Sequence, residues 1–149
     1  MKKNEAIAQA LSMLPPLPDG DVVAVMNEED SHTLQTMDIP HIMAGEAQRA
    51  AAVYACAALQ EEDGIARAAA HAKRLGCPVL AATGNASYAP LALGRLANAE
   101  DADLMSAVLC NPVFTEASLD SRFAQAGFCC AERRDVELEA YDSRMTSVF

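Results

Sequence analysis

Apolar positions in the first part of the chain repeat with a helical spacing and then form one short uninterrupted run. Residues 4–14 place Ile7, Leu11 and Leu14 on one face, which predicts a short amphipathic helix. The proline-rich residues 15–20 end it, because proline cannot continue a helix. The next run, residues 22–26, is apolar and β-branched, a pattern that is typical of a strand but too short to exclude a buried helix.

No proline interrupts residues 44–76, which are rich in alanine and in polar residues that favour helices. We expect a helical hairpin here, divided at Asp63 and Gly64. Lys73 and Arg74 suit the negative end of the second helix. Gly76 is expected to cap that helix at its carboxyl end.

The second half of the chain contains an internal repeat. Residues 79–97 and 105–124 each contain a short apolar segment, an asparagine, a polar turn and an amphipathic helix. Ser87 and Thr115 are expected to cap the two amphipathic helices at their amino ends, and Gly127 follows the second one. A further helix is expected over residues 104–110.

Residues of the two copies, among them Asn85, Leu93, Leu96, Asn111 and Pro112, resemble the recurring positions of the leucine-rich variant repeat, an alanine-rich relative of HEAT-type helical repeats. This resemblance implies short stacked helices that form a solenoid and bind other proteins. We therefore expect a mostly α-helical, solenoid-like single domain over residues 1–149, with residues 128–149 as an extended tail.

The alternative is an α/β fold with a small parallel sheet. It requires residues 22–26, 79–82, 107–110 and 136–141 to be strands, because strands that alternate with helices form parallel sheets. Residues 136–141 alternate apolar and charged side chains, as a strand does, but an edge strand, a short helix and a tail all remain open. The better helical periodicity of residues 104–110 favours the helical fold.

Charge and cysteine content narrow the classes of function. The net charge of −10 and the pI near 4.6 argue against nucleic acid and against anionic membranes as partners. Polar residues follow Lys2 and Lys3, so no signal peptide is expected. The five cysteines are an odd number and read as reduced thiols, which predicts a cytoplasmic protein.

Three acidic clusters are the leading candidates for a binding surface. Stacked helices would align them along one edge, where they would suit another, basic protein. The predicted partner-binding residues are Glu28, Glu29, Asp30, Glu61, Glu62, Asp63, Glu100, Asp101 and Asp103. We therefore expect a non-enzymatic interaction domain, an adaptor or an immunity-type inhibitor. A structural subunit of a larger assembly, including a homo-oligomer, is a further alternative.

The α/β alternative predicts a different site. The loops after Met26, Thr83 and Asn111 would then lie at the carboxyl ends of strands, where such sheets bind ligands. Asn27, Asn85 and Asn111 would be the ligand-binding residues of a small enzyme or binding domain. We assign no catalytic residue, cofactor or metal, because the chain has neither a glycine-rich phosphate loop nor a G-x-S-x-G motif, and its histidines are dispersed.

Overall fold

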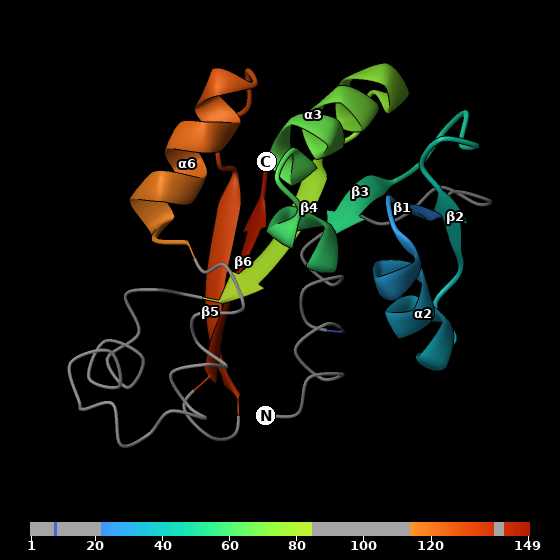
Figure 1. Ribbon diagram of the computed structural model, residues 1–149, viewed down its shortest axis with the longest axis horizontal. Coiled ribbons are helices and arrows are strands. Elements are labelled where there is room, and N and C mark those ends of the chain that lie inside the picture. Colours follow the sequence, from blue (N-terminus) through green and yellow to red (C-terminus); the bar gives the residue numbers. More distant parts are fainter. Residues whose placement is uncertain (1–7, 9–21, 85–113, 139–141) are drawn as a thin grey trace.

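The computed structural model describes residue 8 and residues 22–84, 114–138 and 142–149. These residues form a six-stranded sheet that carries helices on both faces (Figure 1). The strand order is β2-β1-β3-β4-β6-β5. The first four of these strands are parallel to one another, and β6 is antiparallel to β4 and β5.

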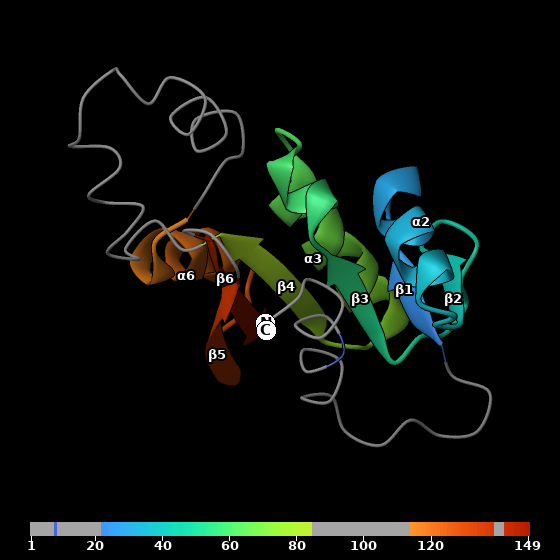
Figure 2. The ribbon, with the colours of Figure 1, turned by 90° about the horizontal axis from the view of Figure 1, so that it is seen from below.

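The described strands are β1 (Val23–Val25), β2 (His41–Met43), β3 (Ala52–Ala55), β4 (Val79–Gly84), β5 (Glu132–Leu138) and β6 (Asp142–Val148). The described helices are α2 (Glu28–Thr36), the 3-10 helix η1 (Ala57–Gln60), α3 (Gly64–Leu75) and α6 (Glu116–Gln125). Figure 2 shows β1, β3 and β4 side by side, with β2 at one end of the sheet and the β5–β6 hairpin at the other. No helix among the described residues is long and apolar enough to cross a membrane.

The expected helical solenoid is therefore wrong, and the α/β alternative describes the fold. Residues 22–26 contain β1, and the first unit of the supposed repeat begins with β4. These apolar runs are strands because each is buried between layers of helices, a condition that short runs alone do not reveal. Residues 85–113, which include the expected helix over 104–110, lie outside the described part of the chain.

Strand β3 shows why the first half of the expected helical hairpin is wrong. All four of its residues are fully buried, and the strand pairs with β1 and β4. Ala52 and Tyr54 contact the core on the α2 side, whereas Val53 and Ala55 contact the core on the α3 side. Burial on both faces overrides the helical preference of alanine, because propensity yields to tertiary packing.

Helix α3 confirms the prediction of a helix for the second half of that hairpin. A Cβ on Gly64 would lie 1.9 Å from the carbonyl oxygen of Ala58, so only glycine lets the helix begin this close to η1. At the other end Gly76 has φ 66°, the left-handed conformation of a glycine cap. The dipeptide turn and the glycine cap were both visible in the local sequence.

The helices divide between the two faces of the sheet. Leu34 of α2 packs on one face with Val25 and Leu80. Ala68 of α3 and Phe123 of α6 pack on the other face. The sheet is thus the middle layer of three, which is a common arrangement of α/β domains.

Residues near the carboxyl end of the chain add the last two strands of the sheet. Residues 128–149, expected as a tail, a strand or a short helix, contribute the β5–β6 hairpin. Thr115 caps α6 as expected, in a reciprocal hydrogen-bonded box with Ser118. The ring of Phe123 on α6 stacks on the ring of Phe149, the residue after β6, with 3.9 Å between the centroids. This contact holds α6 against the end of β6.

Candidate functional site

The carboxyl ends of the parallel strands form the best candidate site. From β1 the chain passes to β2 on one side and then returns to β3 on the other side of β1. The order of strands therefore reverses between β1 and β3. Open α/β sheets bind ligands in the crevice at this point, outside the carboxyl ends of the strands.

Asn27 begins the connection from β1 to α2 and caps the helix. Its Oδ1 accepts a hydrogen bond from the backbone N–H of Asp30 at 2.9 Å. Its Nδ2 donates to the Oε1 of Glu61, which follows η1, at 3.3 Å. Glu28 and Glu29 are exposed in the first turn of α2, so carboxylates already complement the positive end of this helix.

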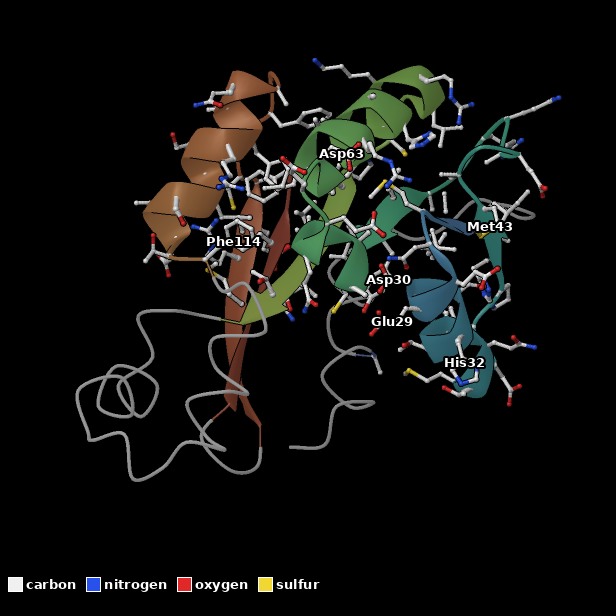
Figure 3. The ribbon with its side chains drawn as sticks, viewed as in Figure 1. Glu29, Asp30, His32, Met43, Asp63 and Phe114 are labelled. Carbon is white, nitrogen blue, oxygen red and sulfur yellow. The ribbon has the colours of Figure 1, made fainter. Side chains whose placement is uncertain are left out.

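Asp30 joins α2 to the turn that follows β3 (Figure 3). Its Oδ1 accepts from the backbone N–H of Ala57 at 2.9 Å, and its Oδ2 accepts from those of Cys56 and Ala58, both at 3.2 Å. The residue is only 2% exposed. We call this arrangement the Asp30 clamp.

Two opposing influences act on the Asp30 carboxyl. Burial raises its pKa above the ordinary value of 3.8, and nearby Glu29 adds to this rise. The three backbone N–H groups lower the pKa because they stabilise the ionised form, but burial is the largest influence. Both oxygens are already engaged with the protein, so Asp30 positions the turn after β3 and is not available as a base for a ligand.

Ser31 and His41 form a second link, between α2 and β2. The Nδ1 of His41 lies 2.8 Å from the carbonyl oxygen of Ile39, so this nitrogen carries the hydrogen. Its Nε2 then accepts from the hydroxyl of Ser31 at 2.8 Å. The sequence indicated neither this pair nor the Asp30 clamp, because the partners are 10 or more residues apart and belong to no motif.

The structure brings together part of the predicted acidic residues. Glu61 accepts from Asn27 and from Arg67, the latter at 2.6 Å, which links the first two clusters. Asp30 is buried, whereas the other acidic residues of these two clusters are exposed: Glu28, Glu29, Glu61, Glu62 and Asp63. The remaining predicted site residues lie outside the described part of the chain: Asn85, Asn111, Glu100, Asp101 and Asp103.

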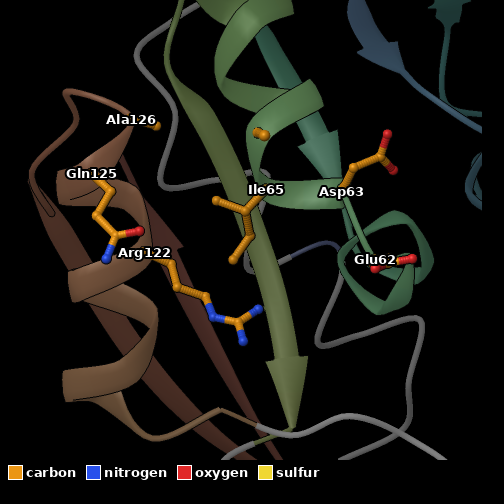
Figure 4. A pocket seen from close by; sticks show the side chains of 7 residues that line it. Glu62, Asp63, Ile65, Arg122, Gln125 and Ala126 are labelled. Atoms are coloured by element: carbon orange, nitrogen blue, oxygen red, sulfur yellow. The ribbon is translucent and has the colours of Figure 1, made fainter.

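The described residues hold no group of three or more histidine, cysteine, aspartate or glutamate side chains that could bind a metal ion. They do form a groove between α3 and α6, with a volume of about 480 Å³ (Figure 4). Its lining residues come from the start of α3 and the second half of α6: Glu62, Asp63, Ile65, Ala66, Arg122, Gln125 and Ala126.

Comparison with known proteins identifies the fold. No family model matches the chain, and no curated protein matches its sequence. Among solved structures, the chain is similar to the magnesium protoporphyrin IX methyltransferase of Synechocystis PCC 6803, solved with bound SAH. The TM-score is 0.57 at 13% sequence identity, over 97% of this chain and 80% of that one. At this identity the likeness shows the fold alone, which is Rossmann-like and of the methyltransferase type.

This fold corrects the expected function as well as the expected fold class. A non-enzymatic interaction domain was inferred from stacked helical repeats, and the described residues form a sheet in place of such a stack. The α/β alternative, with ligands at the carboxyl ends of strands, is the better supported interpretation.

Proposed function

We propose that this chain is a methyltransferase-like domain that binds a cationic, phosphate-free small molecule at the carboxyl ends of β1 and β3. S-adenosylmethionine is the ligand to test first. The observation that carries the proposal is the reversal of strand order between β1 and β3, at an edge that carries exposed carboxylates.

The local sequence disfavours a phosphate-bearing ligand. Phosphates bind at helix amino ends where backbone N–H groups are free and glycine allows close approach. Here β1 leads into α2 through Met26 and Asn27 without a glycine, and Asn27 already caps the helix. Glu28 and Glu29 add negative charge at the same place, which would repel a phosphate.

The same features suit S-adenosylmethionine. This molecule has no phosphate, and its sulfonium and ammonium cations outnumber its one carboxylate. The exposed carboxylates of Glu28 and Glu29 can complement these cations, whereas Glu61 is already paired with Arg67. When bound, the molecule would supply a transferable methyl group. The residues of this chain would bind and orient S-adenosylmethionine. Asn27 and Glu61 form a hydrogen-bonded rim, and the Asp30 clamp holds the turn after β3 in place.

The test is a titration of the purified chain with S-adenosylmethionine, followed by thermal unfolding and calorimetry. A ligand at 100 times its Kd stabilises the folded state by about 2.7 kcal/mol, which gives a measurable rise in Tm. S-adenosylhomocysteine, which lacks the sulfonium charge, should bind more weakly, and ATP should produce no rise. A chain that binds ATP as well as S-adenosylmethionine, or neither, would contradict the proposal.

A matched pair of variants locates the site. Glu29→Gln should weaken S-adenosylmethionine binding by about threefold to tenfold, because it removes one carboxylate from the proposed edge. Asp38→Asn removes the same charge near the opposite, amino-terminal edge of β2 and should leave the affinity unchanged. Asp38 has φ 55°, a conformation that asparagine also adopts, so this control should fold normally.

A further inference from the structure

Arg122 differs from the other arginines of the described residues that form ion pairs. Arg67, Arg133 and Arg134 each lie within 4 Å of a carboxylate. Arg122 is exposed, and its interaction in the described part of the chain is with an aromatic ring: its guanidinium lies over Phe114, 5.4 Å from the centroid. Among the described residues, Arg74 also has no carboxylate partner in an ion pair, but its guanidinium donates to the backbone carbonyl oxygens of Ala44 and Ala47.

Arg122 contacts the ring of Phe114 but is exposed and lines the groove, so its N–H donors can reach a ligand there. Cation–π contact uses the planar face, whereas the N–H donors point outward from the edge. The ring also restricts the side chain, so less conformational entropy is lost when the donors bind an anion. Arg122 is therefore a preoriented anion-binding group.

The groove between α3 and α6 contains this group. Figure 4 shows Arg122 and Gln125 on the α6 side, with Ile65 of α3 between them and the acidic residues. Ala66 and Ala126 complete the apolar part of the lining. A groove of about 480 Å³ falls within the usual size range of small-molecule sites.

The acidic residues set the charge that the groove accepts. Asp63 lies 3.8 Å from Arg67, its neighbour on α3, so it is paired within its own helix. Glu62 is exposed beside it. Two carboxylates at this side would repel a dianion such as phosphate, but a single carboxylate can bind Arg122 on the opposite side.

We propose that the groove between α3 and α6 binds a small monocarboxylate with a flat apolar body, with Arg122 holding the carboxylate and Ile65 contacting the body. Gln125 supplies an additional hydrogen-bond donor beside the guanidinium. The groove adjoins the edge of β1 and β3 through the turn of residues 61–63, but Arg122 belongs to α6, so the proposal stands whether or not that edge binds S-adenosylmethionine.

Benzoate is the probe, and isoleucine methyl groups are the reporters. The chain has four isoleucines: Ile7, Ile39, Ile42 and Ile65. With ¹³C-labelled isoleucine methyls, benzoate should shift the Ile65 resonance saturably. It should leave the resonances of Ile39 and Ile42, at the β2 end of the sheet, in place. Benzamide, the neutral analogue of the same shape, should shift Ile65 at least tenfold less at equal concentration, by about the strength of one charge-assisted contact.

Arg122→Gln should weaken benzoate binding by about tenfold, and Arg134→Gln should not change it. Arg134 is the matched control because it is an exposed arginine that pairs with Glu132 on β5, away from the groove. Unchanged Ile39 and Ile42 resonances in both variants verify that they are folded. Equal binding of benzamide, equal loss in the two variants, or shifts that spread over all the isoleucines would each overturn the proposal.

Discussion

The two ends of the sheet are held together by different chemistry. At the β1–β2 end, α2 buries Leu34 against the sheet and is also attached by two polar links, the Asp30 clamp and the Ser31–His41 pair. At the β5–β6 end, α6 is attached mainly by aromatic packing, with Phe123 between Phe149, which stacks on it, and Phe128, which meets it edge-on at 6.5 Å between centroids. Two ion pairs supplement this packing, because Arg133 of β5 pairs with both Asp120 and Glu116 of α6.

This difference follows from the task of each end. The carboxyl edge of β1 and β3 faces a candidate ligand site, and a polar clamp can fix the turn there without filling the site with apolar side chains. The β5–β6 end only has to hold α6 against the sheet, and the burial of apolar side chains gives the largest stabilisation per residue. The two ends also differ in the pKa of a carboxyl group, which is raised for Asp30 at one end and lowered for Asp120 at the other.

The largest effect is expected at the aromatic end. Phe123→Ala removes a fully buried ring from between α6 and the sheet and should lower the free energy of unfolding by about 3–5 kcal/mol. Urea denaturation measures this loss. Phe128→Ala is the control, since Phe128 is half-buried and should cost only about 1 kcal/mol. Equal losses in the two variants would show that the stack is not the main attachment of α6.

The Asp30 clamp should be nearly as important for stability. Asp30→Ala leaves three backbone N–H groups without their acceptor and should cost about 3 kcal/mol. Hydrogen exchange should speed up at residues 56–58 and remain slow in β5 and β6. Asp30→Asn keeps one acceptor oxygen and should cost less, because only the N–H groups that face its new NH₂ lose their bond. Faster exchange at both ends of the sheet would contradict the proposal that the two ends are stabilised by different contacts.

The smallest effect concerns the Arg133–Asp120 ion pair and depends on pH. The hydrogen bond from Arg133 lowers the pKa of Asp120 below 3.8, so its contribution to stability is present above 3.8 and lost as the pH falls through the folded value. The pair is partly exposed, so Arg133→Gln should cost about 1 kcal/mol or less at about pH 7. The cost should shrink as the pH falls below 3.8 and through the folded-state pKa of Asp120.

Asp30 should show the opposite pH dependence. Its pKa is raised in the folded state, so the fold favours its protonated form, and its contribution falls as the pH rises from 3.8 through the folded value. Urea unfolding of Arg133→Gln and Asp30→Asn across this range compares the two ends directly. The same sign of pH dependence for both carboxyl groups would contradict the assigned environments.

Local signals in the sequence predicted several element boundaries. Gly76 and Thr115 cap helices as expected, and the Asp63–Gly64 turn marks the start of α3. Such signals work because a cap or a tight turn depends on a few adjacent residues. Of the residues at the candidate site, the α/β alternative named Asn27, and the acidic clusters of the main interpretation named Glu28, Glu29, Asp30 and Glu61.

The main interpretation failed where the answer depends on distant parts of the chain. Ala52–Ala55 carries no strong strand signal, and its position between β1 and β4 comes from burial on both faces. The apparent repeat matched common residues such as alanine and leucine, whose spacing says little about what they pack against. Its first segment is β4, paired with β3 and β6.

By itself, then, the sequence determined the caps of α3 and α6, the acidic character of the chain and the lack of a glycine-rich loop after β1. The tertiary structure decided which apolar runs are strands, in what order they lie and which polar groups meet at their ends. The physical reason is the range of the forces involved. A cap is satisfied within one turn of helix, whereas the N–H partners of the Asp30 carboxylate lie 26 to 28 residues along the chain and come near it only in the folded sheet.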